Sequence, residues 1–143
     1  MIDVRTLQAD EYGDVSSSLP LNRLAKPASE YLIAWVGPEA VGHAHIDWSL
    51  DPPELQDVFV LAAHRRLGVA TALTEAAEAH VAGTGGRVLA LTVSVSNAPA
   101  KALYRKLGYV RTAEPPRRVQ GTVQLRSGPL EVDDTLLTFE KRL

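Results

Sequence analysis

The sequence predicts an α/β domain with a mixed, largely antiparallel central sheet of about seven strands and helices on both of its faces. Short β-branched and aromatic runs, separated by glycine and proline, predict antiparallel neighbours up to Leu61. Two stretches at helical spacing, Val69–Val81 and Ala98–Leu107, then lie between later strands. A crossover through one helix usually joins parallel strands, so we expect a mixed sheet.

The N-terminal part of the chain predicts a strand, a polar region and a hairpin. Gly37 and Pro38 mark the hairpin turn, and Pro52 and Pro53 end its second strand. The expected elements are a strand over Ile2–Leu7, a short helix within Gln8–Ser18, a loop or irregular helix over Leu19–Glu30, and strands over Tyr31–Val36, Val41–Leu50 and Leu55–Leu61.

The remaining elements follow from their boundary residues. Gly83–Gly86 ends the first long helix, Asn97 is a good N-cap for the second, and Gly108 can end it. The expected elements are helices over Val69–Val81 and Ala98–Leu107, strands over Arg87–Val95, Tyr109–Thr112 and Thr135–Lys141, and a hairpin arm at Val119–Leu125 within the segment Glu114–Gly128.

Composition limits the classes of protein. The 143 residues suffice for one domain, expected over 1–143, and a net charge of −2 disfavours nucleic-acid partners. The absence of cysteine excludes a disulfide framework and a thiolate metal site, and we expect no metal. No apolar run approaches the roughly 18 residues of a membrane span, and the N-terminus lacks a signal-peptide pattern. We therefore expect a cytoplasmic protein without a membrane partner.

A basic turn lies where the Leu55–Leu61 strand passes into a helix. Arg65, Arg66 and Gly68 directly precede the helix that begins at Val69. The first N–H groups of a helix lack partners and attract anions, and glycine allows close backbone approach. The turn therefore predicts a phosphate site, although arginines at such a junction are as often a solvated corner. It lacks the Gly-Lys-Ser/Thr ending of a P-loop, which disfavours a phosphotransferase.

A second segment carries a tyrosine on a helical stripe. Ala100, Leu103, Tyr104 and Leu107 recur at helical spacing after the Asn97 cap. A tyrosine on such a stripe is more often part of a core than of a catalytic site. By itself, this segment predicts only a capped amphipathic helix.

Together the two segments resemble one family. Arg65-x-x-Gly68-x-Ala70 resembles the Q/R-x-x-G-x-G/A signature of the GNAT superfamily of N-acetyltransferases, and Asn97-x-x-Ala100-x-x-Leu103-Tyr104-x-x-Leu107-Gly108-Tyr109 resembles its N-x-x-A-x-x-L-Y-x-x-x-G-[FY] block. The resemblance is strongest over Leu55–Thr112. It implies the GNAT fold, with a sheet splayed between the fourth and fifth strands, where acetyl-CoA enters between Val60 and Val93.

The resemblance also implies roles for individual residues. The turn wraps the pyrophosphate of acetyl-CoA, the preceding strand pairs with the pantetheine arm, and a bulge in that strand directs an N–H, expected to be that of Val60, at the thioester oxygen. Tyr104 matches the general acid that protonates the departing CoA thiolate. The implied donor contacts are Val58, Phe59, Val60, Arg65, Arg66, Leu67, Gly68, Val69, Ala70, Thr71, Asn97 and Tyr104.

The general base is left open by the sequence. Some relatives carry a glutamate on the strand before Asn97, but Leu91–Ser96 has no carboxylate, which disfavours N-terminal acetylation of a ribosomal protein. Glu54 and Asp57 are the leading side-chain candidates, ahead of His45, and deprotonation through an ordered water is equally possible. His45 alternates with His43 and Asp47 on one strand face, which looks either into the acceptor site or into water.

The acceptor is also left open. Arginines on the arm favour an acidic acceptor, whereas acidic residues near the N-terminus favour a cationic amine; these are Arg117, Arg118 and Arg126, and Asp10, Glu11, Asp14 and Glu30. The leading prediction is an acetyl-CoA-dependent N-acetyltransferase acting on a small primary amine in a ternary complex. The alternatives are a protein lysine or N-terminal acetyltransferase and a non-catalytic acyl-CoA-binding regulatory module. The open sheet edges are compatible with a homodimer.

Overall fold

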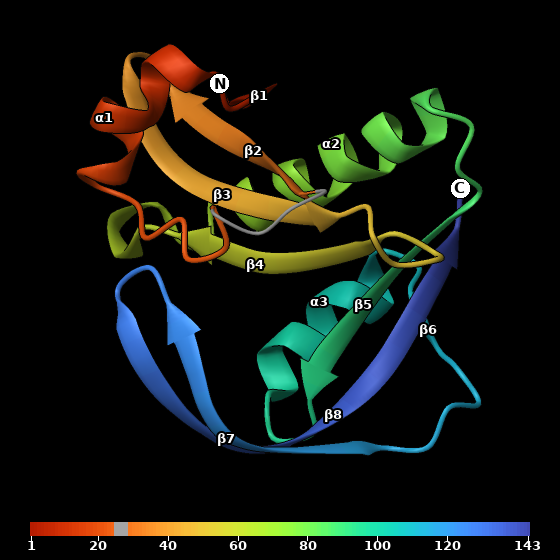
Figure 1. The fold of residues 1–143 in the computed structure, drawn as a ribbon. Coiled ribbons are helices and arrows are strands. Elements are labelled where there is room, and N and C mark those ends of the chain that lie inside the picture. Colours follow the sequence, from red (N-terminus) through yellow and green to blue (C-terminus); the bar gives the residue numbers. More distant parts are fainter. Residues whose placement is uncertain (25–28) are drawn as a thin grey trace.

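A computed structural model describes residues 1–24 and 29–143 of the chain. In this part, eight strands form one curled sheet with helices on both faces (Figure 1). The strands are β1 (Asp3–Thr6), β2 (Ser29–Val36), β3 (Glu39–Asp47), β4 (Glu54–Val60), β5 (Val88–Ser94), β6 (Val110–Arg111), β7 (Arg117–Leu125) and β8 (Gly128–Arg142). The helices are α1 (Tyr12–Ser16), α2 (Val69–Gly83) and α3 (Ala98–Lys106), with 3₁₀ turns η1 (Ala9–Glu11) and η2 (Ala62–His64). None of the helices described is long and apolar enough to cross a membrane.

The sheet is antiparallel except where β4 meets β5. Its order is β1-β2-β3-β4-β5-β8-β6, with β7 paired to β8. β4 and β5 are parallel and register only through Glu54 with Ala90 and Leu55 with Leu91, after which they separate. The predicted mixed sheet, splayed between the fourth and fifth strands, is confirmed. This separation creates the opening in which the candidate site lies.

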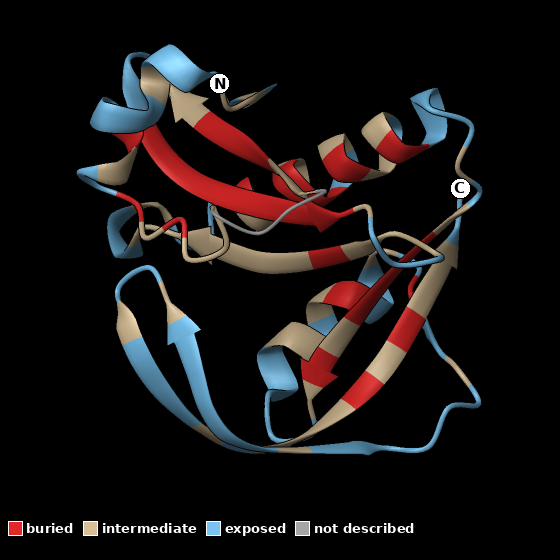
Figure 2. Ribbon diagram, viewed as in Figure 1, coloured by how far each residue is buried: buried red, intermediate tan, exposed pale blue. Residues whose placement is uncertain are grey.

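Each face of the sheet has its own apolar core. The larger core joins α2 to the sheet through fully buried residues such as Leu73, Ala77 and Val81 (Figure 2). The smaller core packs Val15 of α1 and the segment that follows it against Tyr31 and Ile33 of β2. The two cores lie on opposite faces of β2 and β3, and this well-buried half of the sheet supports one wall of the opening.

The face of β3 that carries His43, His45 and Asp47 matches neither of the two sequence expectations, because it looks neither into water nor into the cleft described below. His43, His45 and Asp47 have no solvent exposure, so this face does not look into water. The rings of His43 and His45 each lie 5.0 Å from the ring of Tyr31. The alternation of these residues on one face was predicted from sequence. The segment after α1 that covers this face is distant in the sequence, so its contact with β3 was not predicted.

Most elements differ from their predicted bounds by one or two residues, and the ends of two strands, β3 and β8, differ by more. β3 ends at Asp47 rather than Leu50, since the Asp47 carboxylate accepts hydrogen bonds from the Ser49 N–H (3.0 Å) and hydroxyl (2.5 Å) and so turns the chain. β8 begins at Gly128 rather than near Thr135 and pairs along all of β7. Most of this extension is exposed or half-buried, so no buried-face pattern marks it in the sequence.

The expected hairpin arm is therefore longer than predicted and projects beyond β5. We call β7 and the paired part of β8 (residues 117–136) the arm; its outer half is mostly exposed (Figures 1 and 2). The tip of the arm returns to the segment after α1, where the Arg126 Nε donates to the Pro20 carbonyl (2.7 Å). Asn22 Oδ1 accepts from the N–H (3.2 Å) and hydroxyl (2.9 Å) of Ser127. The arm thus closes a loop across the open side of the sheet.

Candidate active site

The basic turn has the backbone geometry of an anion site. Arg66 (φ 64°) and Gly68 (φ 86°) adopt left-handed conformations, and α2 begins immediately afterwards at Val69. The first hydrogen bond of α2 runs from the Ala72 N–H to the Gly68 carbonyl. The N–H groups of Val69, Ala70 and Thr71 therefore have no acceptor within the helix. A hollow of about 210 Å³ lies over this turn and reaches Val60. These residues fit a phosphate group.

Glycine is favoured at position 68 because of its backbone angle. A Cβ built on Gly68 would meet no atom within 4 Å, so space does not exclude a side chain there. The positive φ disfavours a side chain, because other residues adopt it only with strain. Arg65 supports the turn from the side, as its Nε donates to the Val60 carbonyl (3.1 Å).

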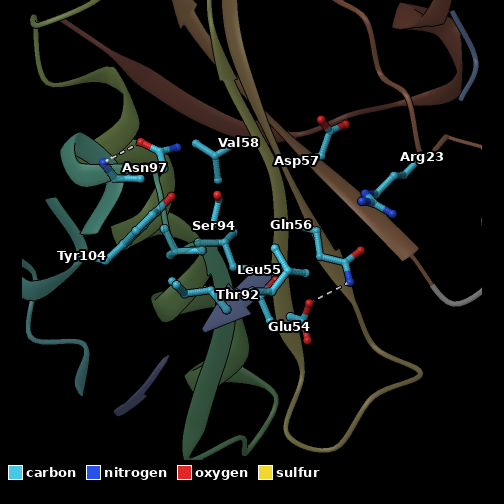
Figure 3. A pocket seen from close by; sticks show the side chains of 14 residues that line it. Arg23, Glu54, Leu55, Gln56, Asp57, Val58, Thr92, Ser94, Asn97 and Tyr104 are labelled. Carbon is cyan, nitrogen blue, oxygen red and sulfur yellow. Dashed lines mark hydrogen bonds between the residues drawn. The ribbon is translucent and has the colours of Figure 1, made fainter. Parts of the chain in front are cut away.

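A cleft of about 400 Å³ occupies the separation between β4 and β5 (Figure 3). Its walls come from β4, β5 and α3, and its far end is formed by Arg23. The lining residues are Arg23, Glu54, Leu55, Gln56, Asp57, Val58, Leu91, Thr92, Val93, Ser94, Asn97, Ala100, Tyr104 and Leu136. The cleft therefore brings together a phenol, two carboxylates, two amides and a guanidinium.

β4 contains a bulge beside this cleft. Its register against β3 shifts between the pairs His43–Phe59 and His45–Gln56, which places one extra residue in β4, and Asp57 has φ 50°. The Leu61 N–H donates to the Val41 carbonyl of β3 (2.9 Å). Since backbone groups alternate along a strand, the Val60 N–H points to the opposite edge, toward the opening. The bulge lies three residues before Val60.

Buried hydrogen bonds hold the bulge in place. The Leu21 N–H donates to His43 Nε2 (3.2 Å), so Nδ1 carries the proton and donates to the Asp57 carbonyl (2.8 Å). Burial lowers the pKa of His43, which keeps this ring neutral. The Tyr31 hydroxyl donates to Asp57 Oδ2 (2.5 Å) and accepts from the Arg23 N–H (2.8 Å). Burial, followed by the nearby Asp57 carboxylate, raises the pKa of Tyr31, so this phenol remains a donor.

Tyr104 is the phenol of the cleft. It is 8% exposed, and its ring packs edge-on against Tyr109 at 5.7 Å. Burial raises its pKa above the ordinary value, so the hydroxyl keeps its proton at neutral pH. A phenol is a weaker acid than a thiol, whose pKa is about 8.5, so lasting proton transfer to a thiolate is unfavourable. Tyr104 is therefore suited to donate a hydrogen bond to a thiolate as its charge develops.

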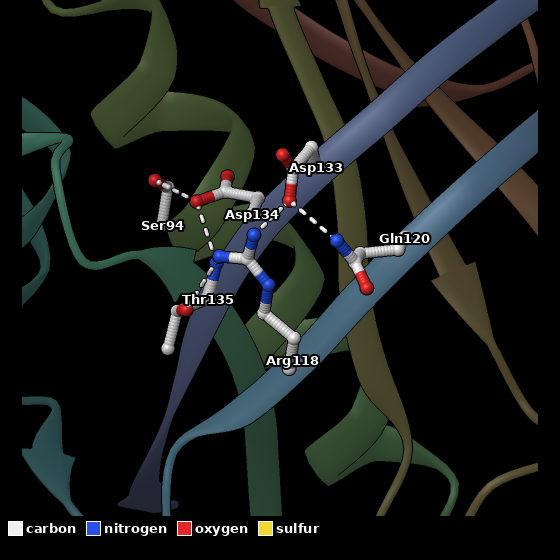
Figure 4. A network of polar contacts seen from close by, with 6 residues as sticks. All are labelled: Ser94, Arg118, Gln120, Asp133, Asp134 and Thr135. Atoms are coloured by element: carbon white, nitrogen blue, oxygen red, sulfur yellow. Dashed lines mark hydrogen bonds and ion pairs between the residues drawn. The ribbon is translucent and has the colours of Figure 1, made fainter.

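Asn97 and Ser94 complete the α3 side of the cleft. Asn97 Oδ1 accepts from the Ala100 N–H (3.1 Å) and caps α3, which leaves its Nδ2 group to donate into the cleft. The Ser94 hydroxyl donates to Asp134 Oδ1 of β8 (2.9 Å), which ties the end of β5 to the base of the arm (Figure 4). On the arm itself, Arg118 pairs with Asp133.

Comparisons with known proteins identify the family. A model described as "Acetyltransferase (GNAT) family" matches residues 2–109. The chain belongs to this family. A mycothiol acetyltransferase from Corynebacterium glutamicum (strain R) is 34% identical over 84 residues, which are 57% of this chain and 28% of that protein, so the match spans under a third of the relative's length.

Solved GNAT structures share the fold. The ribosomal-protein-S18-alanine N-acetyltransferase of Escherichia coli superposes with a TM-score of 0.74 at 19% identity, covering 99% of this chain and 94% of that one. A GNAT family acetyltransferase from Elizabethkingia anophelis with acetyl-CoA bound gives 0.68 at 16% identity, covering 99% and 98%. Family membership, predicted from the two motifs, is confirmed.

The GNAT fold gathers most of the predicted site residues in two places. Tyr104, Asn97, Glu54, Asp57 and Val58 line the cleft. The hollow at the turn is lined by Val60, Arg65, Arg66, Gly68, Val69, Ala70 and Thr71, together with His64 and Leu103.

Three predicted candidates contribute no side chain to either cavity. Phe59 faces the smaller core, with its ring 5.5 Å from that of His43, and Leu67 is 64% exposed and lines neither cavity. His45 is buried behind β4 and does not line the cleft. In each case the side chain lies on the face of its strand or turn that points away from the cavities.

Several residues of the cleft were missed by sequence reasoning. Arg23 comes from an irregular segment with no motif, and Ser94 and Thr92 are ordinary β5 residues. No local signal marks them, because they meet only through the tertiary fold. The acidic and basic groups weighed for acceptor choice lie elsewhere: Asp10, Glu11, Asp14, Glu30, Arg117, Arg118 and Arg126 do not line the cleft.

Proposed function

We propose that the chain is an acetyl-CoA-dependent N-acetyltransferase that acts on a primary amine of a small molecule by direct attack, with both substrates bound together. The observation that carries this proposal is the arrangement of the two cavities along β4, which lines the cleft with Glu54–Val58 and the hollow at the turn with Val60. The hollow lies at the anion-binding turn, and in the cleft Tyr104 faces two carboxylates. Membership of the GNAT family supports acetyl-CoA as the donor.

The donor-binding residues follow this arrangement. The N–H groups of Gly68–Thr71 and the α2 dipole would hold the pyrophosphate, with Arg65 and Arg66 adding positive charge. The free edge of β4 would pair with the pantetheine arm as an added strand does. The Val58 and Val60 N–H groups are the candidates to donate to the thioester oxygen, where negative charge develops during attack.

The transfer requires one bond to form and one to break. The amine nitrogen attacks the acetyl carbon, the C–N bond forms, and the C–S bond breaks to release CoA as a thiolate. Tyr104 donates a hydrogen bond to the departing sulfur. The proton lost by the amine passes to a base on the β4 side and ultimately neutralises the thiolate, so no covalent enzyme intermediate is needed.

Glu54 is the better candidate base of the two carboxylates. Asp57 Oδ2 is already occupied, because it accepts a short 2.5 Å hydrogen bond from the buried Tyr31 hydroxyl. The Glu54 carboxylate accepts a longer bond, 3.2 Å, from the neutral Gln56 amide. We therefore assign proton acceptance to Glu54, directly or through a water, and the support of the bulge to Asp57.

The arm favours a small acceptor over a folded protein. Its tip is hydrogen-bonded to the segment after α1 through Arg126 and Ser127, so the arm limits access to the cleft from the acceptor side. A small amine can enter a cleft bordered by the arm, whereas a lysine on the surface of a folded protein needs an open groove.

Thiol release from acetyl-CoA against a panel of small amines tests the proposal. Tyr104→Phe should lower kcat roughly 100-fold, as expected when one donor to a developing charge is lost. Tyr109→Phe is the matched control, because it removes a neighbouring buried hydroxyl that contacts Glu78 outside the cleft (2.9 Å). Binding of acetyl-CoA without turnover across the panel would instead indicate a non-catalytic module. Equal turnover by Tyr104→Phe and wild type would overturn the role of Tyr104.

A further inference from the structure

Arg23 is a half-buried cation placed between two cavities. Its N–H donates to the Tyr31 hydroxyl (2.8 Å), which anchors the backbone beside the bulge. Its side chain lines the far end of the cleft, opposite Tyr104 (Figure 3). Among the described residues, no carboxylate lies within the 4.0 Å of an ion pair with it. Arg23 is therefore available to bind an anion.

Two other arginines among the described residues near the acceptor side, Arg118 and Arg126, are already engaged. Arg118 pairs with Asp133 on the arm. Arg126 donates to the carbonyls of Pro20 (2.7 Å) and Leu19 (3.1 Å), so its guanidinium serves to fasten the arm. Arg23 is the one lysine or arginine among the described residues that line the cleft.

A second cavity, of about 510 Å³, adjoins Arg23 on its other side. Leu24, Val123 and Leu125 give it an apolar lining, and Asn22, Gln124 and Arg126 lie at its polar edge. Its walls are the segment after α1 and the tip of the arm, joined by the hydrogen bonds of Arg126 and Ser127. The contact between arm and segment thus forms an apolar hollow next to a free cation.

We infer that the acceptor is an amino carboxylate with an apolar side chain, a class that includes apolar amino acids and short apolar peptides. The inference rests on the proposed function and names its acceptor. Glu54 and Asp57 attract the ammonium group, Arg23 pairs with the carboxylate, and the apolar hollow takes the side chain. Arginine binds carboxylate through two parallel hydrogen bonds, so the neutral amide of the same molecule should bind much less well.

Kinetics with matched acceptors test this assignment. For wild type, kcat/KM should be at least tenfold higher for L-leucine or glycyl-L-leucine than for the corresponding amide. Arg23→Gln should abolish that preference, whereas Arg117→Gln, which changes an exposed arm arginine outside both cavities, should retain it. Val123→Ser should reduce the preference for leucine over alanine, and Val110→Ser is its control at another exposed valine.

Product binding separates this inference from the proposed function. With CoA present, calorimetry should show N-acetyl-L-leucine binding at least tenfold more tightly than N-acetyl-L-leucinamide, and Arg23→Gln should remove the difference. If this holds while no amine is acetylated, the proposed function fails and the acceptor site stands. Equal binding of acid and amide by wild type, no binding of either, or an equal loss for both in Arg23→Gln would overturn the inference.

Discussion

Gly68→Ala perturbs the anion-binding turn through its backbone alone. Because the new methyl group would meet no atom within 4 Å, the cost comes from the φ of 86°, which should destabilise the fold by about 1–2 kcal/mol. For 143 residues, the unfolding entropy is about 0.3 kcal/mol/K, so Tm should fall by about 3–7 °C. The same change distorts the N–H groups that start α2 and should raise the KM for acetyl-CoA about tenfold.

Gly85→Ala is a matched control for this prediction. Gly85 has φ 89° and equally open space, but it lies beyond the far end of α2. It should show the same loss of Tm with an unchanged KM for acetyl-CoA. Thermal melting and initial-rate kinetics on both variants measure the two effects separately. A similar rise in KM for both variants, or an unchanged KM for Gly68→Ala, would refute the assignment of the turn.

Three further predictions concern the base, the bulge and the β3–β4 contact. Glu54→Gln should lower kcat roughly 100-fold at pH 7, and its activity should recover partly at higher pH, where more of the amine is neutral. Asp57→Asn should mainly lower the midpoint of urea unfolding. The reverse pattern would make Asp57 the base. Burial lowers the pKa of His43, so as the pH falls this imidazole is protonated in the unfolded chain before it is protonated in the folded one. The free energy of unfolding should therefore decrease below about pH 6.5, by at most about 1.4 kcal/mol per pH unit. In His43→Asn, the midpoint of urea unfolding should change less between pH 7 and pH 5 than in wild type. An unchanged pH dependence would contradict the assigned role of His43 in the hydrogen bonds that hold the bulge. Gly42→Ala places a Cβ 2.7 Å from a β4 carbonyl oxygen and should cost about 1–3 kcal/mol in urea unfolding, whereas Gly13→Ala, in open space, should be neutral or stabilising.

The sequence predicted the elements whose signals are local. The helix starting at Val69 follows a glycine with a positive φ, and α3 begins at the predicted Asn97 cap. The motifs that contain these residues also predicted the family and the splayed sheet. Where a turn or cap residue fixes the backbone within a few positions, the local sequence pattern is enough to predict where the element begins.

The interior of the site depends on contacts between distant residues. The Tyr31 hydroxyl meets Asp57 across 26 positions, and Arg126 reaches Pro20 across 106. Burial of His43 requires the segment after α1 to cover β3, which no property of β3 itself indicates. Arg23 enters the cleft for the same reason, so the acceptor side could not be predicted from sequence.

A crystal structure with CoA bound tests the central claim most directly. We expect the pyrophosphate against the N–H groups of Gly68–Thr71, the pantetheine arm along the free edge of β4, and the sulfur within hydrogen-bonding distance of the Tyr104 hydroxyl. CoA bound outside the opening between β4 and β5, or a sulfur turned away from Tyr104, would contradict the account.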